Sequence, residues 1–246
     1  MALHVYLKEN TSPKRKVINY ISYITLVVGM ILMFWSFYPV ISFELYSRFI
    51  LKDGINSPLS GTVASSVREA QSVLGTADAF SSNLKDFTQA HLWFPSTKQE
   101  DSGSKAGLKE YSITIPKINI QKAQVLVGSD DLTKSLVHFL PKTMPGEFGN
   151  VAIFGHSTLP QLYNEKDYKT IFTYLPSLEK SDRILVHVGD LEYEYEVVDM
   201  FVVNPDKVSV LDQQYDASYL TLITCVPPGT YWKRLVVKAK LLRLPQ

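Results

Sequence analysis

The sequence contains one cysteine, Cys225, and its position suggests two different roles. Cys225 ends the apolar run YLTLITC and stands directly before the turn sequence VPPGT. A lone thiol cannot form an internal disulfide, and most free cysteines are small buried hydrophobic residues. A thiol at a strand end, before a Pro-Pro-Gly turn, would instead lie at the mouth of a β-barrel, where a substrate can reach it. The sequence therefore leaves open a structural thiol and an accessible nucleophile.

His156 is the residue best suited to assist such a nucleophile. It follows the apolar run NVAIF by one residue, Gly155, and begins a polar loop. Gly155 lets the chain turn and lets a neighbour approach closely. An imidazole is the usual partner of a nucleophilic thiol, because it can deliver a proton to a leaving amine. The alternative is a loop histidine without a chemical role, and spacing along the chain does not decide between them.

Arg234 follows Cys225 by nine residues. If VPPGTYW forms the turn between two antiparallel strands, Arg234 returns beside Cys225. Its guanidinium could then donate hydrogen bonds to a tetrahedral oxyanion or hold the backbone of a substrate. The alternative is a solvated arginine on the same strand face as Lys238 and Lys240.

Composition excludes several other kinds of function. Lys and Arg (25) nearly cancel Asp and Glu (24), so nucleic acid is not an expected partner. A single cysteine excludes a Cys-rich zinc site, and no nucleotide-binding, HExxH or GxSxG motif occurs. We therefore predict no metal and no cofactor. His4, His91 and His187 are interpreted as tail, linker and strand residues.

Short apolar runs predict a mainly all-β domain over residues 108–246. The dipeptide Gly189-Asp190 between two such runs predicts a hairpin, because Gly supplies a positive φ. Many short strands at regular spacing indicate a closed sandwich or barrel. One short helix is predicted near residues 166–174. The predicted strands cover residues 111–115, two stretches within 118–128, and 150–154, 183–188, 192–203, 219–225 and 234–244.

Residues 17–43 contain no Asp, Glu, Lys or Arg and are long enough for a transmembrane helix. Lys14, Arg15 and Lys16 precede this span, so the positive-inside rule places the basic tail, residues 1–16, in the cytoplasm and the rest outside. A cleaved signal peptide is the alternative, but no clear small-residue cleavage site follows. An exposed thiol outside the cell is open to oxidation, which favours a chemical use for Cys225.

Residues 44–107 separate the anchor from the predicted β-domain. They are rich in small and polar residues, and residues 96–107 read as a flexible linker. We predict a stalk, with one or two loose helices between residues 63 and 94. A lid over the active site is the second possibility.

Three blocks of the sequence together resemble the sortase family. TLITC followed by Arg234 is similar to the family's TLxTC…R signature. NVAIFGH, preceded by PGEFG, resembles its PGexGNxxixGH block. IPKINI followed by LVG resembles an early strand motif. The resemblance covers residues 108–246 and includes the order His, Cys, Arg.

The resemblance implies an eight-stranded sortase β-barrel with one or two short helices, and an extracellular transpeptidase activity. Cys225 would attack an LPxTG-like sorting motif between Thr and Gly and form a thioester. His156 would act as general acid and then as general base, and Arg234 would stabilise the oxyanion or grip the motif. The partners would be sorting-signal-bearing surface proteins and an amine acceptor, such as a peptidoglycan precursor or a lysine of a pilin.

Two further residues are weaker candidates for substrate binding, His138 and Thr224. Val137 precedes His138 where the family often has Gly. The sequence also lacks a DPW-type lid motif, and no acidic cluster marks a calcium site.

Two alternative functions use the same residues differently. A membrane-tethered cysteine peptidase would form the same acyl-enzyme but release it to water. A non-catalytic surface β-barrel would keep Cys225 as a structural thiol.

Overall fold

The computed structural model describes residues 13–49, 86–95 and 108–243. By its internal contacts the chain divides into two compact units, residues 1–42 and residues 43–246. The predicted linker at residues 96–107 and most of the predicted stalk lie outside the described residues.

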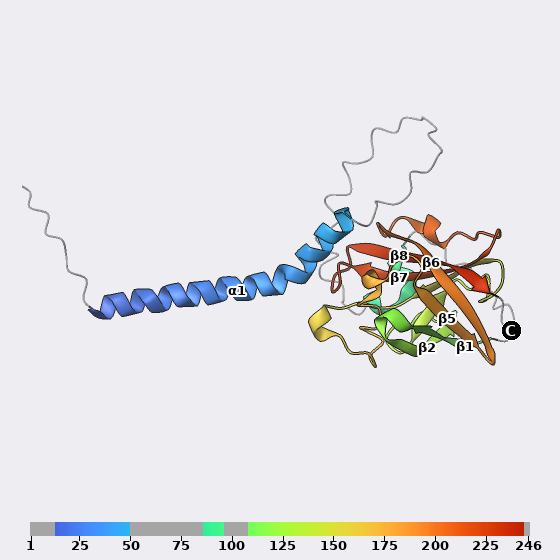
Figure 1. Cartoon of the computed structure of the whole chain (residues 1–246), viewed down its shortest axis with the longest axis horizontal. Helices are drawn as coiled ribbons and strands as arrows, with labels where there is room; N and C mark the ends of the chain where they lie inside the picture. Colours follow the sequence, from blue (N-terminus) through green and yellow to red (C-terminus); the bar gives the residue numbers. More distant parts are fainter. Residues whose placement is uncertain (1–12, 50–85, 96–107, 244–246) are drawn as a thin grey trace, which may run out of the picture. The chain divides into compact units, whose positions relative to one another are not determined.

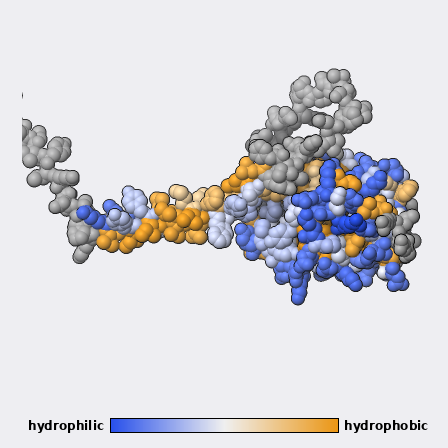
Figure 2. Space-filling view, viewed as in Figure 1, coloured by the Kyte–Doolittle hydropathy of each residue, from blue (hydrophilic) through white to orange (hydrophobic). Residues whose placement is uncertain are grey.

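The first described element is a long helix, α1 (Pro13–Phe49). The segment Lys16–Leu45 is long and apolar enough to cross a membrane, judged by length and composition. Figure 2 shows hydrophobic side chains over much of the visible surface of this helix. Such a helix is consistent with a membrane anchor, because apolar side chains on every face suit a lipid environment better than water.

Eight strands form a closed barrel, as expected for the mainly all-β domain, in the order β1-β2-β3-β4-β7-β8-β6-β5. Figure 1 shows the strands of this domain gathered around one another. Neighbouring strands are antiparallel except for two parallel pairs, β2 with β3 and β4 with β7. The strands are β1 (Glu110–Ile115), β2 (Ile120–Val127), β3 (Leu136–Phe139), β4 (Gly149–Phe154), β5 (Arg183–Val188), β6 (Leu191–Val203), β7 (Ser218–Val226) and β8 (Lys233–Arg243).

Strand β7 is buried on both of its faces, which explains its nearly continuous apolar sequence. Leu220 and Leu222 belong to the core inside the barrel. Ile223 and Cys225 point to the opposite face, where they belong to a second apolar cluster. The alternation of a strand therefore assigns Cys225 to the outer face of the barrel wall.

That second cluster is covered by short 3-10 helices from distant parts of the chain. η2 (Asp86–Thr88) and η3 (Ala90–Trp93) precede the barrel, and η7 (Val208–Leu211) lies between β6 and β7. Trp93, Phe94 and Val210 contribute buried side chains to the cluster. The remaining 3-10 helices are η4 (Pro116–Ile118), η5 (Pro160–Leu162) and η6 (Leu175–Ser177).

The structure confirms the hairpin at Gly189, whose φ is +58°, corrects two other local predictions and adds one strand. Residues 166–174 form successive turns instead of a helix, because side-chain bonds such as that from Thr170 Oγ1 to the carbonyl of Asn164 stabilise turns there. Residues 118–128 provide one strand, not two, because Ile118 belongs to a 3-10 helix and Ile120–Val127 form a single unbroken strand that pairs with β1. Strand β3, with four residues, was not predicted.

Gly155 links β4 to His156 in a space too small for any larger residue. A Cβ at this position would lie 2.5 Å from side-chain atoms of Leu136 and of Phe172, both buried. We predict that Gly155→Ala lowers the free energy of unfolding by about 2–3 kcal/mol, because two core side chains must move. Thermal or urea unfolding measures this change.

The matched control is Gly189→Ala. A Cβ there meets no atom within 4 Å, so only its positive φ should cost stability, about 1 kcal/mol. Equal losses in the two variants would contradict the steric explanation for Gly155.

Candidate active site

The three residues singled out in the sequence come together at one edge of the barrel. Cys225 on β7 lies directly opposite Arg234 on β8, in an antiparallel register that runs from Tyr219 to Val226. Side chains of opposed residues on neighbouring strands are about 5 Å apart at Cβ. The turn over VPPGTYW therefore returns Arg234 beside Cys225, as the spacing predicts.

His156 reaches the same edge from the neighbouring strand. Strand β4 runs parallel to β7, with Phe154 opposite Ile223, so both strands end together. The carbonyl of His156 accepts a hydrogen bond from the backbone N–H of Phe172 at 2.9 Å, which anchors the residue to the connection that follows.

Arg234 is almost completely buried, with 1% of its surface exposed. Its guanidinium donates to backbone carbonyls: Nη1 to Tyr231 at 3.1 Å and to Lys233 at 3.3 Å, and Nη2 to Trp93 at 3.1 Å. Among the described residues, its Nε has no hydrogen-bond partner. Arg234 is thus held by neutral acceptors, and part of its capacity to donate is unused.

Residues 86–95 lie against these three residues, and Trp93 makes the central contacts. Its ring stacks on Phe154 at 5.4 Å, meets His156 at 5.5 Å and lies 5.4 Å from the guanidinium carbon of Arg234. Cys225 belongs to the same apolar cluster and is only 2% exposed. The expectation of an accessible thiol is therefore wrong for this arrangement, because the 86–95 segment and the surrounding apolar cluster bury it.

The loop between β2 and β3 holds the 86–95 segment in place. The backbone N–H of Ala90 donates to the carbonyl of Asp130 at 3.0 Å. The carboxylate of Asp130 accepts from the backbone N–H of His91 at 2.8 Å and pairs with Nδ1 of its ring at 2.6 Å. At the start of the segment, Phe87 stacks on Tyr231 of the β7–β8 loop at 4.2 Å.

Burial sets the protonation states of the site. It raises the pKa of the Cys225 thiol to about 11, although Arg234 acts in the opposite direction. It lowers the pKa of His156 to about 4, and the positive charge of Lys169 adds to this effect. Near pH 7 the thiol and the imidazole are therefore both neutral while Trp93 covers them.

The two weaker candidates face away from this site. His138 belongs to β3, and its ring meets that of Tyr111 inside the barrel at 5.9 Å. Thr224 is fully buried, and its hydroxyl donates to the carbonyl of Gly155 at 2.8 Å. Neither residue comes together with the outward-facing Cys225, so a role for them in binding substrate stays a prediction without geometric support.

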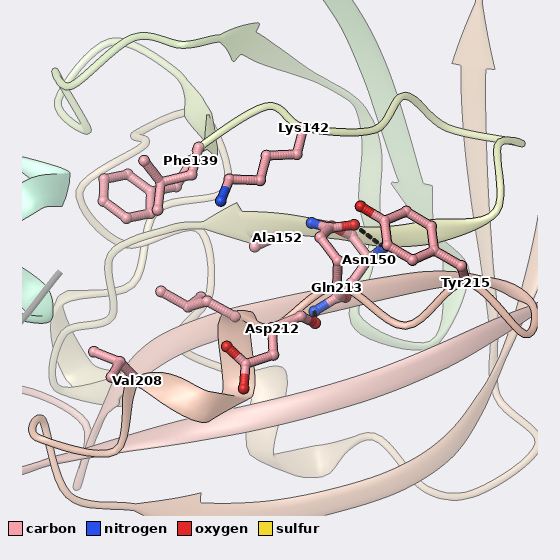
Figure 3. A pocket seen from close by; sticks show the side chains of 10 residues that line it. Phe139, Lys142, Asn150, Ala152, Val208, Asp212, Gln213 and Tyr215 are labelled. Carbon is pink, nitrogen blue, oxygen red and sulfur yellow. Dashed lines mark hydrogen bonds between the residues drawn. The ribbon is translucent and has the colours of Figure 1, made fainter. Parts of the chain in front are cut away.

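A cavity of about 400 Å³ opens farther along the outer face of β4 (Figure 3). Stacked aromatic side chains lie between the cavity and the covered site, because Phe139 at the cavity's edge packs on Phe154 with ring centroids 4.7 Å apart. The Gln213 amide fixes one wall by exchanging hydrogen bonds with the backbone of Asn150. The cavity is lined by Phe139, Leu140, Lys142, Asn150, Ala152, Val208, Leu211, Asp212, Gln213 and Tyr215.

Sequence reasoning missed the residues that cover the site, above all Trp93, and the residues of the cavity. The only signal was the apolar run LWF (residues 92–94) within an otherwise mostly polar stretch. An apolar run of three residues predicts burial, but it does not predict the surface that buries it.

The fold and the site define a class of β-barrel protein. In this class a cysteine near the end of β7 lies opposite an arginine on β8, and a histidine follows the neighbouring strand β4. The sortase domain model matches residues 113–242, which is more than half of the chain. The chain therefore belongs to the sortase family, whose members are cysteine transpeptidases.

Individual relatives agree with this assignment. Sortase D of Bacillus subtilis is 29% identical over 57% of this chain, and the match spans 65% of the relative, slightly less than two thirds of its length. Sortase A of Listeria monocytogenes is 26% identical over 90% of each chain. The crystal structure of Streptococcus pneumoniae sortase C is 25% identical, with a TM-score of 0.51, and covers 62% of this chain and 79% of that one.

The depressed pKa of His156 predicts that acid weakens the contact of Trp93 with the site. An imidazole freed from the site should titrate near 6.5, whereas the covered one titrates at about 4. Between these values the open arrangement binds a proton that the closed one does not. Lowering the pH from 7 to 4.5 should therefore favour opening, by up to about tenfold for each unit below 6.5.

Acrylamide quenching of Trp93 fluorescence measures this opening in a Trp35→Phe/Trp232→Phe background, which leaves Trp93 as the only tryptophan. His156→Gln in that background is the control and should remove the extra quenching at low pH. The contact between His91 and Asp130 is present in both proteins, so their difference reports His156 alone. Identical pH profiles would refute the prediction.

Proposed function

We propose that this chain is a membrane-anchored cysteine transpeptidase that acts on an LPxTG-like sorting motif. The observation that carries the proposal is the direct opposition of Cys225 and Arg234 across β7 and β8, with His156 at the end of the adjoining strand β4. A nucleophile, a proton carrier and an anion-stabilising group at one edge are the parts that acyl transfer needs.

In the proposed reaction the thiol of Cys225 transfers its proton to His156 as the sulfur attacks the carbonyl carbon of the scissile peptide bond. Arg234 donates hydrogen bonds to the oxyanion or to the motif's backbone. His156 delivers a proton to the leaving amine as the C–N bond breaks, and a thioester remains. An incoming amine, deprotonated by His156, then attacks the thioester and forms a new C–N bond as the C–S bond breaks, and His156 returns the proton to the sulfur of Cys225.

The 86–95 segment acts in this proposal as a lid, the second of the two roles that the sequence left open. The carbonyl of Trp93 accepts a hydrogen bond from Arg234, which is the kind of contact proposed for the substrate's backbone. Trp93 and the motif therefore cannot occupy the site together, and substrate must displace the segment.

With the lid displaced, the sorting motif would extend from Cys225 over Phe154 and Phe139 toward the cavity beside β4. Stacked aromatic rings offer an apolar surface, and the cavity adds polar groups, such as Asn150 and Gln213, that can fix the orientation of a peptide.

The partners follow from the reaction and from the helix α1. Sorting-signal-bearing surface proteins would supply the acyl group, and a peptidoglycan precursor or a pilin lysine would supply the amine. The structure of Streptococcus pneumoniae sortase C, which this chain resembles, has been interpreted in terms of pilin substrate specificity. The basic residues before residue 17 favour a cytoplasmic N-terminus, with the barrel outside the cell.

Trapping the acyl-enzyme tests the proposed reaction directly. Incubation of the protein with a panel of LPxTG-like peptides should add the mass of the acyl fragment to Cys225, and Cys225→Ala should abolish it. Addition of an amine should change the released product from acid to amide. A product that never changes with amine would support the peptidase alternative, and activity retained by Cys225→Ala would refute both enzyme hypotheses.

Arg234→Lys keeps the positive charge but loses the guanidinium's fork of hydrogen-bond donors, so kcat should fall by about 10²–10³-fold.

Removing the indole of Trp93 tests the lid. Trp93→Ala should accelerate alkylation of the single thiol by iodoacetamide by about 10–100-fold, because part of the buried contact that holds the segment over the thiol is lost. Intact-mass spectrometry follows the reaction without ambiguity, since Cys225 is the only cysteine. Trp232→Ala is the matched control: this indole is 66% exposed, and its loss should leave the rate unchanged. Equal rates in both variants and the wild type would contradict the lid.

A further inference from the structure

Two side-chain hydroxyls tie the turn that carries His156 to the strand that carries Cys225. The backbone pairing of β4 with β7 continues as far as Gly155, whose N–H donates to the carbonyl of Ile223 at 3.1 Å. Beyond that point side chains take over. Thr224 donates to the carbonyl of Gly155 at 2.8 Å.

The second hydroxyl belongs to Ser157, the residue after the histidine. Its Oγ donates to the backbone carbonyl of Cys225 at 2.6 Å. The two bonds therefore enclose both groups of the proposed reaction. One joins the residues that precede Cys225 and His156, and the other joins Cys225 itself to the residue that follows His156.

The far side of this turn is fixed independently. The N–H of Thr158 donates to Thr173 Oγ1 at 3.0 Å, and the carbonyl of His156 accepts from Phe172. Because the turn is held from behind by residues 172–173, the Ser157 bond determines how closely the main chain at Cys225 approaches it. A bond of this kind adjusts the position of a thiol relative to an imidazole without touching either group.

We propose that Ser157 is a positioning residue for the proposed acyl transfer, an inference that rests on the proposed function. Its hydroxyl holds the main chain of Cys225 against the His156 turn, so that the sulfur and the imidazole keep a productive separation. Thr224 is fully buried, so its loss would be difficult to separate from loss of folding. Ser157 is only half-buried, which makes it the informative site for substitution.

The decisive comparison uses the full-length protein in detergent and the variants Ser157→Ala and Ser157→Thr. Ser157→Ala should lower kcat for an LPxTG-like peptide by about 10–100-fold with KM nearly unchanged, because a displacement of about 1 Å costs that much in rate. Ser157→Thr keeps the hydroxyl and should recover most of kcat.

Ser177→Ala is the matched control. Its hydroxyl also donates to a backbone carbonyl, that of Tyr174 at 2.7 Å, in the same connection between β4 and β5 but on an exposed surface. It should leave kcat, KM and the pH profile unchanged. Thermal unfolding of each variant checks that the folded fraction is the same.

A second readout does not depend on the substrate. The rate of alkylation of Cys225 by iodoacetamide, measured from pH 5 to 10, reports how the thiol titrates beside His156. Ser157→Ala should move the midpoint of this profile by more than about half a pH unit, whereas Ser157→Thr and Ser177→Ala should not.

Each outcome decides the proposal. A Ser157→Ala protein with kcat and midpoint like the wild type overturns it, as does a loss of kcat that Ser157→Thr fails to restore. If no peptide acylates the wild type, the proposed function fails. The alkylation profile then still decides whether Ser157 positions the thiol.

Discussion

The parallel pairing of β4 with β7 is the constraint on which the candidate active site depends. Parallel neighbours need a long crossover, and here the chain between them forms β5, β6 and the loop that contains η7. The pairing brings the ends of two strands to one edge, so that a histidine and a cysteine 69 residues apart in sequence become neighbours. The antiparallel return of β8 then adds Arg234 opposite Cys225.

The buried guanidinium of Arg234 links this edge to the segment that covers it. Removing a charge from water is costly unless polar groups replace the lost hydration. One of the acceptors is the carbonyl of Tyr231 in the turn between β7 and β8, the second is that of Lys233 at the start of β8, and the third is the carbonyl of Trp93. The covering segment therefore does more than exclude water, because it also compensates a charge that its own presence has buried.

The sequence predicted the elements of the site better than its surroundings. The nine-residue spacing from Cys225 to Arg234, across a turn rich in Pro and Gly, was enough to predict an antiparallel return, which the register confirms. The apolar run before His156 predicted β4. Local sequence was sufficient for these two predictions, because strand alternation and turn residues act over short distances along the chain.

What local sequence could not predict depends on distant contacts. Strand β3 has only four residues and is buried on both faces, so it shows no alternation. The 86–95 segment was interpreted as part of a stalk, and its place is fixed by Asp130, His156 and Arg234, which lie far along the chain. The expected exposure of Cys225 failed for the same reason, since the side chains that cover it come from another part of the sequence.

The covered state also reconciles the two roles that the sequence left open for Cys225. A thiolate is the form that oxidants attack, and burial raises the pKa of this thiol to about 11. While Trp93 occupies the site, Cys225 has the properties of a structural cysteine: neutral, apolar and enclosed. The proposed nucleophile needs the opposite properties, which departure of Trp93 would favour. If the barrel lies outside the cell, as proposed, the same segment would both protect the thiol and make its reactivity depend on a substrate able to displace an indole ring.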